Sequence, residues 1–134
     1  MRPSPKWPGA KLPARSVDEL NAFVQRNLET ARKAFAAGVK FAMGSDAVYT
    51  MFGENTRELA WLVKAGMTPE QALRAATVNG AELLGIETSL GALQPGFVAD
   101  IVAVEGDPLA DIEIAIRKVR WVMKAGQVVV DKTR

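Results

Sequence analysis

The chain has 134 residues, of which 49% are hydrophobic and 24% charged, an ordinary composition for one globular domain with a sizeable core. Its 17 basic and 15 acidic side chains leave a net charge of +2 without a basic cluster, so we expect no nucleic-acid partner. The sequence contains no cysteine, which excludes disulfides and thiolate zinc sites, and it contains no histidine. No apolar run approaches the roughly 18 residues of a membrane span, so we expect no membrane partner.

The N-terminal residues are rich in proline, with four of the seven prolines at positions 3, 5, 8 and 13. Because proline fixes φ and lacks a backbone N–H, residues 1–15 are predicted to form an extended arm. The arm has no apolar stretch of the kind found in a secretory signal. If Met1 is the natural start, we expect a cytoplasmic protein; the sequence otherwise leaves the compartment open.

A first helix is predicted to begin at a capping box formed by Ser16 and Glu19 and to end before Gly38. A short apolar strand, residues 39–43, follows almost without a loop. Helix, glycine and short apolar strand in this order are typical of alternating α/β proteins. A lone strand among helices cannot satisfy its backbone hydrogen bonds, so this α/β part is predicted to be incomplete.

Two further helical segments are predicted after this strand. One covers residues 54–65, and the next starts at a second capping box, formed by Thr68 and Gln71. The pair at 79–80, Asn-Gly, is expected to end that helix, and residues 81–84 to add one more helical turn.

From Leu90 onward the sequence has β character, and we predict three or four strands. Residues 98–104 form one strand, and residues 117–123 alternate in polarity as a second. The Ala125-Gly126 turn then leads into residues 128–130, which we expect to form a hairpin with the preceding strand.

Several other polar and aromatic residues are expected to have structural roles. Asp107 is followed by proline in a predicted turn, and Asp100 lies in a half-exposed strand, so neither is expected to bind a metal. Trp61 and Trp121 are predicted to be core residues. Lys40 precedes the end of its strand and is expected to be structural.

The segment GVKFAMGSDA, residues 38–47, carries the short apolar strand directly into Ser45 and Asp46. A carboxylate at the end of a strand can be a catalytic or metal-binding group. An aspartate in an ordinary turn, accepting backbone N–H bonds, gives the same pattern. These residues alone leave both interpretations open.

Four stretches of the sequence together resemble the metal-dependent amidohydrolase superfamily, with the Xaa-Pro dipeptidase-like and imidazolonepropionase-like hydrolases as the nearest subgroup. In chain order they are GVKFAMGSDA, FGENTRELAWLVKAGMTPEQALRAATVNGAELLG, LGALQPGFVADIVAVEGDPLADI and VMKAGQVV. The resemblance covers roughly residues 16–134 and places the chain in the C-terminal third of such an enzyme.

The resemblance implies an α/β fold, the C-terminal fragment of an amidohydrolase TIM barrel followed by the C-terminal strands of the small β-sandwich domain. Residues 16–85 are then the last part of the barrel and residues 86–134 the β-sandwich tail. Within the barrel part, the resemblance makes residues 16–37 the seventh helix, 39–44 the eighth strand and 54–65 the eighth helix.

The resemblance also implies hydrolysis of a C–N bond in a small peptide or amide by metal-activated water, with zinc as the expected divalent metal. Asp46 matches the family's eighth-strand aspartate, which contacts the metal and takes a proton from its water. Catalytic groups of barrels lie at the C-terminal ends of strands, which agrees with this placement. Tyr49 and Asn55 are weaker candidates for substrate contact, since loop packing and helix capping explain them as well.

The family's other metal ligands are histidines and a lysine or glutamate that follow earlier strands, and no such segment is present. Because a catalytic zinc site uses about three protein ligands, this chain alone is expected to bind no metal tightly and to be inactive. One hypothesis is a hydrolase that needs an N-terminal amidohydrolase portion. The alternative is a non-catalytic structural or complementation module that pairs with a partner chain or self-associates through its exposed strand edges.

Overall fold

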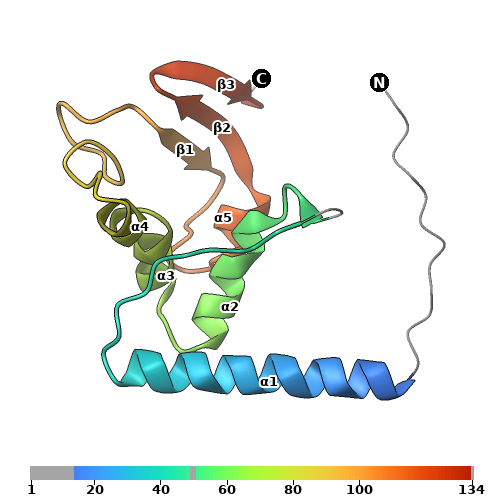
Figure 1. Cartoon of the computed structure of the whole chain (residues 1–134). Helices are drawn as coiled ribbons and strands as arrows, with labels where there is room; N and C mark the ends of the chain where they lie inside the picture. Colours follow the sequence, from blue (N-terminus) through green and yellow to red (C-terminus); the bar gives the residue numbers. More distant parts are fainter. Residues whose placement is uncertain (1–13, 49–50, 134) are drawn as a thin grey trace.

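The computed structural model describes residues 14–48 and 51–133 of a mixed α/β chain (Figure 1). Most of the predicted N-terminal arm therefore lies outside the described residues. The helices and strands occur in the following order: α1 (Ala14–Ala36), η2 (Asn55–Arg57), α2 (Glu58–Lys64), α3 (Pro69–Ala76), α4 (Val78–Leu83), β1 (Ile101–Val104), α5 (Glu113–Arg117), β2 (Val119–Lys124) and β3 (Gln127–Asp131). None of the described helices has the length and hydrophobicity needed to cross a membrane.

Helix α1 begins two residues earlier than predicted, at Ala14, so the predicted start of the helix at Ser16 is wrong. Its C-terminal end is confirmed. Gly38 has a φ of +80° and donates to the Phe35 carbonyl at 2.9 Å, while the Val39 N–H reaches the Ala34 carbonyl at 3.1 Å. This pair of bonds satisfies the last carbonyls of the helix in the way that a glycine after the helix end allows.

Helix α1 is attached to the rest of the molecule near its C-terminal end. The Phe35 ring meets the Phe41 ring edge-on with 6.4 Å between centroids, and Arg32 Nε donates to the Lys64 carbonyl at 3.1 Å. The N-terminal half of the helix extends past α2 (Figure 1). Its apolar side chains there remain exposed, with Leu20 51% and Phe23 52% accessible.

The predicted strand at residues 39–43 is not formed. Residues 39–48 run past α3 and α4 without pairing with any of the described strands (Figure 1). Helices supply the contacts instead: the Met43 N–H donates to the Ala75 carbonyl at 2.9 Å, and Asn79 Nδ2 donates to the Phe41 carbonyl at 2.8 Å. A strand needs a neighbouring strand, and the three strands of the structure pair only with one another.

The second capping box is confirmed in full. Thr68 Oγ1 accepts the Gln71 N–H at 3.2 Å, and Gln71 Oε1 accepts the Thr68 N–H at 2.8 Å, which fixes the start of α3. The expected break at Asn79 and Gly80 is wrong, because both residues lie inside α4. The helical segment instead breaks at Thr77, whose φ of −123° and ψ of −90° are not helical.

The C-terminal strands form one antiparallel sheet in the order β1-β2-β3. The predicted hairpin is confirmed: β2 and β3 are joined by Ala125 and Gly126, with φ values of 48° and 78°. Two successive residues with positive φ are what a tight two-residue hairpin loop requires. The first strand begins at Ile101 rather than at residue 98, and residues 113–117 form the short helix α5, which the sequence did not indicate.

The core is small and lies between α2, α3 and α5. The buried side chains in the described part are all apolar: Leu59, Leu62, Ala65, Met67, Ala72, Ala75, Ala81 and Ile112. Ile112 belongs to the same cluster as the α2 and α3 residues, so the core includes residues from both sides of residue 85. Trp61 is 39% exposed, with Lys64 Nζ 4.3 Å from its ring centroid, so its prediction as a core residue is wrong; Trp121 is half-buried in β2.

Replacing Thr68 by alanine is expected to lower the free energy of unfolding by about 1 kcal/mol, because the Gln71 N–H loses its acceptor. Urea denaturation followed by circular dichroism measures this loss. Thr30→Ala is the matched control, since the Thr30 hydroxyl only donates to the Arg26 carbonyl within α1. An equal loss of stability in both variants would contradict a specific role for the capping box.

Candidate functional site

Asp46 lies at the end of the extended segment, directly after Gly44 and Ser45. Its φ of 45° places it in the left-handed region, which non-glycine residues adopt uncommonly. The side chain is exposed, and it makes no hydrogen bond or ion pair with any residue that the structure describes. Its carboxylate therefore caps no described backbone N–H and stays available to another molecule or chain.

The turn around Asp46 is held by the hydroxyl of Ser45. Ser45 Oγ accepts the Ala47 N–H at 3.4 Å and Asn55 Nδ2 at 3.0 Å. Asn55, at the start of η2, thus lies beside the Asp46 turn, and its side-chain amide donates to Ser45. Tyr49, the other weak candidate for substrate contact, lies outside the described residues.

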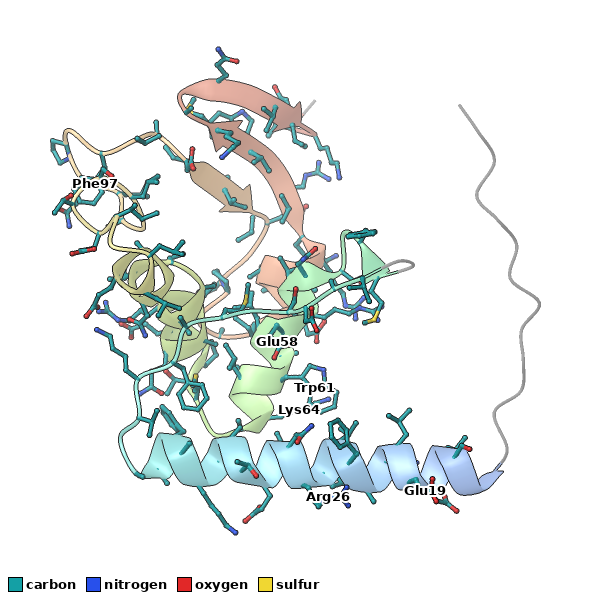
Figure 2. The ribbon with its side chains drawn as sticks, in the orientation of Figure 1. Glu19, Arg26, Glu58, Trp61, Lys64 and Phe97 are labelled. Carbon is teal, nitrogen blue, oxygen red and sulfur yellow. The ribbon has the colours of Figure 1, made fainter. Side chains whose placement is uncertain are left out.

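Glu58 is a second carboxylate near the start of this helical segment. It is the first residue of α2, directly after η2, and it is half-buried in the middle of the molecule (Figure 2). Burial raises the pKa of the Glu58 carboxyl above its ordinary value, because the charged form loses hydration. A raised pKa is common at functional sites, although burial at a helix start explains it without a ligand.

The residues of this chain do not fit a complete metal centre. Across residues 14–48 and 51–133, no group of three or more histidine, cysteine, aspartate or glutamate side chains could hold a metal ion. The whole sequence contains neither histidine nor cysteine. Asp46 thus offers one carboxylate where a catalytic zinc site uses about three protein ligands.

The other charged residues considered from the sequence have structural contacts. Asp100 Oδ1 accepts the Ala125 N–H at 2.6 Å beside the hairpin turn, and Asp107 Oδ1 accepts the Leu109 N–H at 2.9 Å in its predicted turn. Lys40 forms an ion pair with Glu82 of α4, which links the extended segment to that helix. These contacts agree with the structural roles expected for them.

A hollow of about 190 Å³ lies at the opposite end of the extended segment from Asp46. Phe35, Phe41, Met67 and Arg74 are among the side chains that line it. Asp46 is not among the residues that line this hollow, so the hollow is not a pocket around the candidate carboxylate.

Residues 7–129 match the Amidohydrolase family, and the chain belongs to this family. Ochratoxinase of Aspergillus niger is 36% identical over 108 residues, which make up 79% of this chain and 22% of ochratoxinase. Imidazolonepropionase of Shouchella clausii is 29% identical over 116 residues, 81% of this chain and 26% of that enzyme. The resemblance seen in the sequence is therefore confirmed.

Solved structures agree with this assignment. A Xaa-Pro dipeptidase with bound methionine in the active site matches with a TM-score of 0.72 at 39% identity, covering 77% of this chain and 25% of the dipeptidase. A prolidase complexed with N-methylphosphonate-L-proline matches with a TM-score of 0.71 at 29% identity, covering 90% and 30%. The chain corresponds to the C-terminal part of such proteins and spans between 22% and 30% of their length.

Calorimetric titration of the chain with zinc chloride is expected to show no saturable binding in the micromolar range. The physical reason is the ligand count, since Asp46 alone cannot replace the hydration shell of the ion. The Asp46→Asn variant should give the same titration curve. A saturable site of micromolar affinity or tighter that disappears in Asp46→Asn would show that the ligand count is wrong.

Proposed function

We propose that this chain is the C-terminal part of a dipeptidase-like amidohydrolase, which hydrolyses a C–N bond in a small peptide or amide, and that Asp46 is its catalytic carboxylate. The observation that carries this proposal is the family match over residues 7–129, which includes the segment that ends in Asp46. The relatives of this chain are hydrolases, among them an Xaa-Pro dipeptidase and a prolidase.

In this proposal the elements take the places that the family gives them. Helix α1 is the seventh helix of a TIM barrel, and η2 with α2 forms its eighth helix. Residues 39–44, which form no strand among the described residues, become the eighth strand when the missing barrel strands pair with them. Strands β1 to β3 belong to the small β-sandwich. Asp46 then lies at the C-terminal end of a barrel strand, where barrel enzymes carry their catalytic groups.

The contribution of this chain to the reaction is a carboxylate that can accept a proton. Asp46 is exposed and makes no ion pair with a described residue, so its oxygens are free to take that proton from an attacking nucleophile. A divalent metal, with zinc expected, belongs to the complete enzyme and lowers the pKa of a bound water there. The other ligands for that metal, besides Asp46, come in this proposal from another portion of polypeptide.

That portion is, in our proposal, an N-terminal amidohydrolase piece that supplies the remaining strands. Two features of this chain support such a partner. The first is the extended segment 39–48, which has no neighbouring strand in the described part of the chain. The second is the apolar face of α1, where Val17, Leu20 and Phe23 are exposed although their spacing is that of a helix that packs against a core.

Mixing the chain with a separately expressed N-terminal portion of an Xaa-Pro dipeptidase and zinc is expected to produce hydrolysis of an Xaa-Pro dipeptide that neither piece catalyses alone. Asp46→Asn should lower the rate of the mixture by about 10²-fold or more, because the proton acceptor is lost. Glu87→Gln, a matched change of an exposed carboxylate to an amide, should leave the rate unchanged. Equal rates for Asp46→Asn and the unmodified chain would rule out the proposed role of Asp46.

A second candidate function is a non-catalytic module that self-associates. It is favoured by the backbone groups of Lys40, Ala42 and Gly44, which make no hydrogen bond to a described residue. Unpaired edges of extended backbone are templates for pairing with another chain. This candidate requires no chemistry from Asp46.

Light scattering at micromolar concentration is expected to give a mass of at least two copies of the 14.4 kDa chain. Ala42→Pro should reduce this association because it removes one backbone N–H from the open edge, whereas Ala42→Ser keeps the N–H and should not. Circular dichroism shows whether both variants remain folded. A monomer in the unmodified chain would exclude self-association.

A further inference from the structure

We infer that Asn55 is a positioning residue for Asp46 and that it acts through the hydroxyl of Ser45. The inference rests on the proposed function, because it assigns Asn55 a role in presenting the carboxylate that the proposal makes catalytic. It starts from the unusual backbone of Asp46, whose φ of 45° lies in the left-handed region. Such conformations persist in non-glycine residues where the surrounding structure holds them in place.

The contacts that hold this conformation come from the residues on either side of Asp46. Ser45 Oγ accepts the N–H of Ala47 at 3.4 Å, so one hydrogen bond closes the turn across Asp46. The same oxygen accepts Asn55 Nδ2 at 3.0 Å. A serine hydroxyl has two acceptor lone pairs, and it can therefore hold both donors at once.

Asn55 is joined directly to a helix of the core. It opens η2, which runs directly into α2, and the α2 side chains Leu59 and Leu62 are only 4% and 7% exposed. The backbone of Asn55 is thus continuous with a helix that buried side chains hold, whereas the Asn55 side chain is exposed and is placed by its hydrogen bond to Ser45. Asn55 contacts Ser45, and Ser45 closes the turn that contains Asp46. Neither contact involves the carboxylate oxygens of Asp46.

Helix capping does not account for the Asn55 side chain. The residue at the N-terminal cap of η2 is Glu54, whose side chain caps no backbone N–H of the helix. Asn55 Nδ2 is a donor and is spent on Ser45, ten residues earlier in the chain, whereas a capping side chain accepts a backbone N–H. The described contact therefore serves the Asp46 turn.

Nuclear magnetic resonance of the full chain tests this inference without any enzymatic assay. The three-bond coupling between the amide and α protons of Asp46, together with its carbon chemical shifts, reports φ. Asn55→Ala is expected to move these values away from the left-handed region, while Asn21→Ala, a matched change on the exposed surface of α1, leaves them unchanged. Wild-type values in a folded Asn55→Ala chain would overturn the inference.

Variants of Ser45 keep the test decisive if Asn55→Ala does not fold. Ser45→Ala removes the shared acceptor and should shift the Asp46 signals, whereas Ser45→Thr retains a hydroxyl and should restore them. If the Ser45 side chain contributed only by packing, the Asp46 signals would not depend on whether a hydroxyl is present at position 45. Equal Asp46 signals in Ser45→Ala and the unmodified chain would exclude the role of Ser45.

In the complementation mixture, Asn55→Ala is expected to lower kcat about tenfold to a hundredfold with little change in KM, because misplacement of a catalytic group affects the chemical step. A direct substrate contact would instead raise KM.

If the mixture shows no hydrolysis while the resonance experiment shows the expected shifts, the proposed function fails and the positioning of Asp46 by Asn55 stands. If hydrolysis occurs and the Asp46 signals do not respond to Asn55→Ala, the positioning inference alone fails.

Discussion

The structure depends on one constraint, the hydrogen-bonding demand of the backbone between residues 39 and 48. Along an extended chain, the groups of alternate residues point to opposite edges. Phe41 and Met43 share one edge, and α3 and α4 occupy it through the Ala75 carbonyl and the Asn79 amide. On the opposite edge, the backbone groups of Lys40, Ala42 and Gly44 make no hydrogen bond to a described residue, so water or another strand must satisfy them. The segment thus has strand-like geometry without a sheet.

The unequal distribution of packing follows from this constraint. The apolar cluster of α2, α3 and Ile112 holds the centre, and Phe35, Phe41 and Met43 pack against it. The N-terminal half of α1 and the turn at Asp46 remain exposed. Elements with little buried surface open more readily than the core to which they are attached. The candidate site therefore lies in a weakly held part of the chain, and its geometry depends on specific hydrogen bonds more than on packing.

Features that depend on neighbours in the sequence could be predicted, and features that depend on distant partners could not. The Thr68–Gln71 capping box and the Ala125-Gly126 hairpin turn are local chemistry, and both are confirmed. The strand at 39–43 was predicted from its apolar run, but a strand exists only with a partner. Asp46 could be singled out from its place after that run. The contact between Ser45 and Asn55 could not be predicted, because it joins two residues ten positions apart across a loop and no repeating sequence pattern marks it.

The conformation of Asp46 is consistent with the role proposed for its carboxylate. A left-handed φ at a non-glycine residue is unfavourable, and an aspartate usually offsets it by bonding to nearby backbone. Here the carboxylate makes no such bond to the described residues, and the serine before it supplies the bond that closes the turn. Local stability would be served by a glycine at this position, which adopts positive φ without strain. A carboxylate that is held in a strained turn and makes no bond to the described residues is what the proposed function requires of Asp46.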